Sequence, residues 1–174
     1  MVNNQQNAMT HEMNEELEQA LSRPADYSDH FAKQVDELCL GLSQSLGINF
    51  FHDDHMDYRS AQRIILWLDA SHKPTNEVSE AFFEATIFIS SRGKFCAVIC
   101  RHRNVGLDGF WTSVPINSAS PSLRLYIQKA KEFLEARSYV FTCPSTLSKY
   151  AEGHKTEMDN LPATVFEVLF SEID

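Results

Sequence analysis

The chain has 174 residues, of which 43% are hydrophobic, and it carries a net charge of −9. This length suffices for one domain with its own core, and this composition excludes an intrinsically disordered chain. The longest apolar run, residues 64–68, is far shorter than the ~20 residues that cross a bilayer. The polar N-terminal residues show no hydrophobic signal segment, so we expect a cytoplasmic protein.

Most of the negative charge lies in the first third of the chain. Residues 1–60 hold eleven acidic and three basic residues, whereas the remainder holds thirteen acidic and twelve basic residues. A surface of this charge repels nucleic acid and speeds association with a basic partner. We therefore expect a basic protein partner and no binding of nucleic acid or membrane.

Two helices are predicted in the N-terminal third. Residues 1–9 are predicted to form a flexible tail, and residues 10–174 to form one domain. Thr10 is predicted to cap a first helix that ends at Pro24. A second helix is predicted over residues 28–46, because apolar residues there recur at steps of three and four and Gly47 suits a left-handed helix end. Its apolar stripe consists of Phe31, Val35, Leu38, Leu42 and Leu46.

Segments rich in Phe, Ile, Val, Thr and Trp follow, a composition typical of strands. The predicted strands are residues 63–69, 81–90, 94–100, 109–114, 138–143 and 163–170. Residues 91–93 are predicted to form a tight hairpin turn in which Gly93 supplies a positive φ. Both faces of the two strands beside this turn are largely apolar, which predicts that they lie in the centre of the sheet, covered on both sides or nearly so.

A long helix is predicted between the fourth and fifth strands. Ser120 is its expected N-cap, Pro121 its first residue, and Leu123, Tyr126, Ile127, Ala130, Phe133 and Leu134 its buried stripe. Residues 145–156 are predicted to form a short helix or a loop. The predicted fold class is α+β: two N-terminal helices, then a mainly antiparallel sheet of about five to six strands that carries one long helix.

The segment FFHDDHMDY at residues 50–58 allows three interpretations. His52, Asp53, Asp54 and His55 offer ligands for the metal of a hydrolase, although His52 and His55 are three residues apart rather than the four of a helical H-E-x-x-H site. The letters H-D-D-H also resemble the His-Asp pair of HD-type phosphohydrolases, whose further ligands on later helices have no counterpart here. Alternatively, Asp54 caps a helix with Asp57 in its first turn. The third interpretation is an acidic patch that faces a partner.

Two further groups of residues carry chemistry. Arg92, Lys94, Arg101, His102 and Arg103 lie at the two ends of the central hairpin, where they either bind an anion or are solvated. Cys39, Cys96, Cys100 and Cys143 form no C-x-x-C pair and fit buried hydrophobic residues of a reducing compartment. Cys143, followed by Pro144 and with His154 nearby in sequence, is either a structural residue in a turn or a reactive thiol.

The chain resembles the immunity proteins of bacterial polymorphic toxin systems, including those of contact-dependent inhibition, in being small, acidic and without catalytic motifs. The acidic residues from Glu12 to Asp57 carry the resemblance. It implies inhibition of a basic toxin domain, often a nuclease, by binding and without a cofactor. The expected partner-binding residues are Asp53, Asp54 and Asp57, supported by Glu12, Glu15, Glu16 and Glu18. The alternatives are the metal-dependent hydrolase and a non-catalytic dimeric scaffold or sensor.

Overall fold

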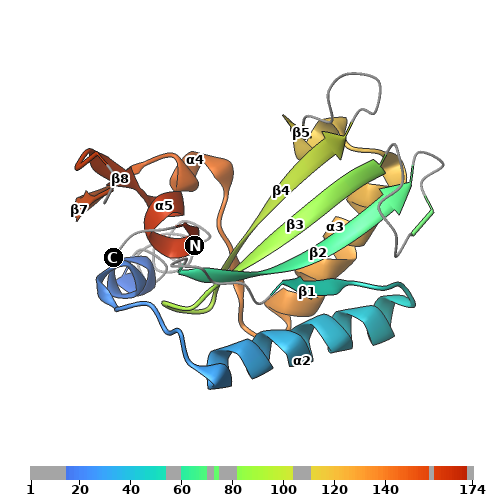
Figure 1. The fold of residues 1–174 in the computed structure, drawn as a ribbon, viewed down its shortest axis with the longest axis horizontal. Coiled ribbons are helices and arrows are strands. Elements are labelled where there is room, and N and C mark those ends of the chain that lie inside the picture. The colour runs from blue at the N-terminus through green and yellow to red at the C-terminus, as the bar shows by residue number, and fades with distance from the viewer. Residues whose placement is uncertain are drawn as a thin grey trace, which may run out of the picture.

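A mainly antiparallel sheet organises the computed structural model, which describes residues 15–53, 60–69, 73–74, 82–103, 111–156 and 159–171. Five strands follow one another across the sheet in chain order: β1 (Phe51–Asp53), β2 (Ala61–Asp69), β3 (Phe82–Ser90), β4 (Phe95–Arg103) and β5 (Trp111–Val114). A sixth, β6 (Val140–Phe141), pairs in parallel with the start of β4, while β5 pairs with its end. The predicted α+β fold is confirmed (Figure 1).

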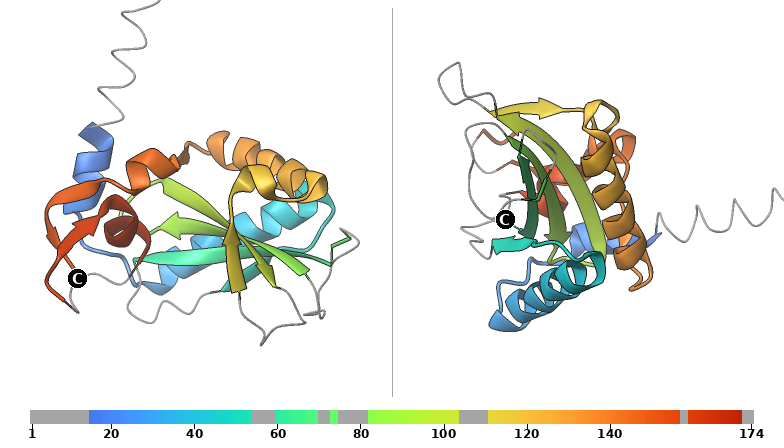
Figure 2. Two further views of the ribbon diagram at one scale, coloured as in Figure 1. Left: turned by 90° about the horizontal axis from the view of Figure 1, so that it is seen from above. Right: turned by 90° about the vertical axis from the view of Figure 1, so that its right-hand side faces the viewer.

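Two long helices cover one face of this sheet. α2 (Asp29–Leu46) and α3 (Pro121–Glu135) lie on the same side of the strands (Figure 2). Alternate strand residues point toward them, because side chains along a strand alternate between its faces. This core includes Ile64, Leu66, Ala85, Ile87, Cys96 and Cys100 from the sheet, and Val35, Leu42, Leu123 and Leu134 from the helices.

The ends of α2 and α3 follow from local sequence. The hydroxyl of Ser28 accepts a hydrogen bond from the backbone N–H of Phe31, and Gly47 ends α2 with a φ of 63°. The hydroxyl of Ser120 likewise accepts from the backbone N–H of Leu123, with Pro121 at the first position of α3. These caps satisfy backbone groups that a helix end leaves unpaired, so both predicted helices are confirmed. A short 3-10 turn, η1 (Ile116–Ser118), precedes α3.

The opposite face of the sheet is covered at one end by other described elements of the chain. α5 (Val165–Phe170), a helical segment at residues 15–22, and the two-stranded sheet of β7 (Tyr150–Lys155) and β8 (Pro162–Thr164) gather there (Figure 1). Their core includes Ala20, Phe88, Phe95, Ala97, Val168 and Phe170. β3 is therefore buried almost throughout, as predicted for a central strand.

Three predictions were wrong in detail. Residues 163–170 are predicted as one strand, but Thr164 caps the helix α5 in a reciprocal capping box with Glu167. Residues 145–156 are predicted as a short helix or a loop: the short helix is present as most of α4 (Pro144–Leu147), but the strand β7 that follows it was not predicted. Gly93 has no positive φ; a Cβ there would lie 3.2 Å from that of Ala20, so its small size serves close packing. The predicted tail and the cap at Thr10 lie outside the described residues.

None of the helices in the described part of the chain is long and apolar enough to cross a bilayer.

Candidate functional site

The N-terminal helical region presents an acidic surface. Between residues 15 and 46, seven carboxylates and two basic side chains are exposed. The carboxylates belong to Glu15, Glu16, Glu18, Asp26, Asp29, Asp36 and Glu37, and the bases are Arg23 and Lys33. The apolar stripes of both helices face the core, so the acidic side chains remain in solvent. We name these seven residues the acidic surface.

An exposed leucine lies within this surface. The Leu40 side chain on α2 is 57% exposed, although α2 buries Val35, Cys39 and Leu42. Asp36 and Glu37 precede Leu40 by four and three residues, which places all three on neighbouring positions of the helix surface. An apolar side chain bordered by charged groups fits the apolar core and polar rim of a protein interface. Leu40 is not among the site residues predicted from the sequence, because its apolar character alone predicts burial.

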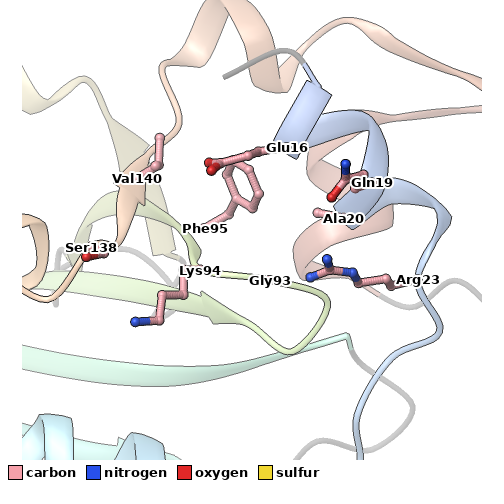
Figure 3. A pocket seen from close by; sticks show the side chains of 9 residues that line it. All are labelled: Glu16, Gln19, Ala20, Arg23, Gly93, Lys94, Phe95, Ser138 and Val140. Atoms are coloured by element: carbon pink, nitrogen blue, oxygen red, sulfur yellow. The ribbon is translucent and has the colours of Figure 1, made fainter. Parts of the chain in front are cut away.

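Glu16 belongs to a second part of the acidic surface. It lines a pocket of about 280 Å³ between the N-terminal helix and the hairpin turn, together with Lys94 and Phe95 (Figure 3). Arg92, the middle residue of this turn, is buried and donates a hydrogen bond to the carbonyl oxygen of Arg23. The helix at residues 15–22 is therefore held against the hairpin, and its glutamates are presented from a fixed position.

The remaining predicted acidic residues are only partly described. Asp53 lies at the end of β1 and forms a salt bridge with Arg63, both side chains being half-buried. An aspartate that already has a guanidinium partner is less available to a second one. Glu12, Asp54 and Asp57 lie outside the described residues, as does the helix start predicted at Asp54. Of the predicted partner-binding residues that the structure describes, Glu15, Glu16 and Glu18 are thus more exposed than Asp53.

The geometry of β1 also bears on the metal interpretation. Neighbouring residues of a strand point to opposite faces, and the contacts of His52 and Asp53 show this alternation. The Nε2 of His52 donates to the Oε1 of Gln62 (2.6 Å), and its Nδ1 lies 3.5 Å from Oδ1 of Asp36 on α2. Asp53 instead contacts Arg63. His52 and Asp53 therefore do not converge on one ion, and no cluster of three metal-ligating side chains occurs among the described residues; His55 is not among them.

The sheet face opposite α2 and α3 contains a buried carboxylate. Glu84 on β3 accepts hydrogen bonds from the indole Nε1 of Trp67 (3.0 Å) and the hydroxyl of Thr86 (2.7 Å). An Nη of Arg101 lies 3.8 Å from the same carboxylate. Trp67 also packs against Phe51, with ring centroids 4.6 Å apart. A buried carboxylate is stable only with such partners, and the network fixes the side chains of three adjacent strands.

The predicted basic cluster does not act as one site. Lys94 donates to the carbonyl oxygen of Arg137 and lies over the ring of Tyr139. His102 packs against Phe83 on the helix-covered face, whereas Arg101 lies on the opposite face with Glu84. The hairpin therefore distributes these charges to different surfaces. Arg101 lines a pocket together with Arg63.

Cys143 differs from the other three cysteines. Cys39, Cys96 and Cys100 are buried, and burial raises the pKa of each thiol. Cys143 is exposed at the start of α4, where the hydroxyls of Ser145 and Thr146 lie 3.1 and 3.2 Å from its sulfur. Hydrogen bonds from Ser145 and Thr146 lower the pKa of this thiol to about 7. The structure therefore separates one thiolate-forming cysteine from three packing residues.

We expect iodoacetamide to label Cys143 alone in the folded protein. Its labelling rate should rise with pH around a midpoint near pH 7, because the thiolate that forms above the pKa is the nucleophile. Intact mass and peptide mapping measure the site and the rate. The Cys143→Ser variant should remain unlabelled until the protein is unfolded. Labelling of Cys96 or Cys100 at a similar rate in the native protein would contradict the burial of these residues.

The chain matches no protein-family model, no curated protein and no solved structure.

Proposed function

We propose that this protein is an immunity-type inhibitor that binds a basic toxin domain through its acidic surface. The observation that carries the proposal is Leu40, exposed on α2 beside the exposed carboxylates of Asp36 and Glu37. Binding would bury the leucine and surround it with charges that attract a cationic partner. The protein would act in the cytoplasm, with no cofactor, by occluding the active site of its partner.

Growth rescue tests this function. The C-terminal domain encoded by the gene immediately upstream is produced in bacteria with and without this chain. We expect the domain to arrest growth when it is produced alone, and this chain to restore growth through a complex that co-purifies with it. A harmless upstream product, or a toxic domain that this chain neither binds nor neutralises, would contradict the proposal.

The contribution of the acidic surface is tested separately by variants. We expect the triple variant Asp29→Asn, Asp36→Asn, Glu37→Asn to slow association at low salt by about 10-fold or more, because long-range attraction acts mainly on the association rate. Biolayer interferometry at low and high salt measures this rate. The matched control changes the exposed acids Glu132, Glu135 and Glu152 to glutamine and should associate at the original rate.

Leu40→Ser provides the complementary measurement. Loss of an interface leucine should raise the dissociation rate and leave the association rate nearly unchanged, since interface packing acts after the encounter. Leu125, which is also exposed but lies on α3, supplies the control variant Leu125→Ser. If the α2 variants and their controls bind alike, the toxin domain docks elsewhere on the protein.

A further inference from the structure

A pocket of about 380 Å³ lies on the sheet face that α2 and α3 do not cover. Arg63 on β2 and Arg101 on β4 line it, and both strands flank β3. Arg63 pairs with Phe88 and Arg101 with Glu84 in the register of the sheet. Because Phe88 and Glu84 are an even number of residues apart, both arginines project from the same face. Two guanidinium groups therefore line one cavity of ligand-binding size.

The remaining lining of this pocket is mainly apolar. Phe88 and Ile99 come from the sheet, and Phe166 comes from α5, whose last turn closes one end. The rings of Phe88 and Phe166 meet edge to face, with centroids 5.5 Å apart. Ser171, directly after α5, adds a hydroxyl-bearing residue. A bound molecule would thus meet apolar ring surface, mainly that of the half-buried Phe166, beside the polar groups of the two arginines.

The hydrogen-bonding capacity of the two arginines is not used up within the described residues. Arg63 pairs with Asp53, yet its Nε is buried without a hydrogen-bond partner there. Arg101 is 35% exposed, and its 3.8 Å separation from Glu84 is too long for a hydrogen bond. The Nε of Arg63 is buried, so the partly exposed guanidinium of Arg101 is the group through which an anion in the pocket would be bound.

The charges around the pocket select the kind of anion. Asp53 and Glu84 lie beside the two arginines, and they balance the positive charge of the arginines. A dianion such as a phosphate monoester would be repelled by these carboxylates more strongly than a monoanion. A guanidinium group also matches the planar geometry of a carboxylate. We propose that the pocket binds a small organic monocarboxylate with an apolar, preferably aromatic, body.

The pocket shares no lining residue with the acidic surface. Leu40, Asp36 and Glu37 lie on α2, which packs against the opposite face of the sheet, so occupancy of the pocket requires no partner bound at α2 (Figure 2). Failure of the immunity proposal would leave this one standing, and the reverse is equally true. The proposed small-molecule ligand of the pocket is therefore additional to the protein partner that we propose for the acidic surface.

Isothermal titration calorimetry on the full chain tests the proposal with three probes of similar shape. 3-Phenylpropionate is expected to bind, while the neutral 3-phenylpropionamide should bind at least about 10-fold more weakly because it cannot form a charge-assisted pair. Phenyl phosphate should also bind more weakly than 3-phenylpropionate. Absence of carboxylate binding, equal binding of the amide, or tighter binding of the phosphate would each overturn the proposal.

Variants locate the site. Arg101→Gln is expected to weaken 3-phenylpropionate binding about 10-fold or more, the size of one lost charge-assisted hydrogen bond. Arg124→Gln, which changes an exposed arginine of α3, should bind as the original protein does. Circular dichroism confirms that both variants fold. Unchanged binding by Arg101→Gln would overturn the assignment, and the comparison of acid with amide on the unaltered protein decides the question even if that variant does not fold.

Discussion

Replacing Phe170 with alanine is expected to lower the free energy of unfolding by about 3–5 kcal/mol, the usual cost of removing a fully buried phenylalanine. Phe170 is 1% exposed at the end of α5. Its ring lies 6.2 Å from that of Phe88 on β3 and 5.6 Å from that of Phe166, measured between centroids. The alanine variant would leave a cavity between the helix and the sheet, which the surrounding side chains fill only in part. Urea denaturation followed by circular dichroism measures the change.

Two matched variants in the same helix sharpen this test. Phe166 is only half-buried, so Phe166→Ala should cost clearly less than Phe170→Ala although the chemical change is identical. Leu169 and its neighbour Phe170 are both fully buried. In a strand with one buried face, neighbouring side chains point to opposite faces, so Leu169 would be exposed if Phe170 were buried, whereas a helix packed on a sheet can bury both. Leu169→Ala is therefore expected to cost about 2–5 kcal/mol. A near-neutral Leu169→Ala would support the strand that the composition alone predicts.

The helices that sequence reasoning located correctly are those with independent local signals. α2 and α3 each combine a serine cap, a long apolar stripe and either a terminal Gly47 or an initial Pro121. α5 is only six residues long and rich in valine and phenylalanine, so its composition is that of a strand. The pair Thr164 and Glu167, which forms a capping box, is a sequence signal for a helix start. The prediction of a strand gave more weight to the β-branched and aromatic residues of this segment.

The candidate sites were less predictable than the fold, because they depend on pairings that span the sheet. The acidic segment at residues 52–57 suggests one continuous patch, yet β1 directs His52 toward α2 and Asp53 toward Arg63. Glu84 is an acidic residue within an apolar run, and no role was predicted for it from the sequence. Its partners, Trp67 on β2 and Arg101 on β4, become evident only from the strand register.

The second large effect concerns that buried carboxylate. Glu84→Ala is expected to lower the free energy of unfolding by about 2–4 kcal/mol, because it leaves the indole N–H of Trp67 and the hydroxyl of Thr86 without their acceptor. Loss of the ion pair with Arg101 should add little to this change in the free energy of unfolding, since the Arg101 side chain is 35% exposed and water replaces the lost partner. Urea denaturation followed by circular dichroism measures the stability.

Glu84→Gln is the matched control for this prediction. Its amide oxygen still accepts one of the two hydrogen bonds, so its cost should be smaller than that of Glu84→Ala. A double-mutant cycle with Trp67→Phe, which removes the indole donor, isolates the direct contact, and we expect a coupling energy of about 0.5–3 kcal/mol. If the two substitutions were additive, the 3.0 Å contact would contribute no stability of its own. Coupling of the expected size would instead show that the hydrogen bond between Glu84 and Trp67 itself stabilises the pairing of β2 with β3.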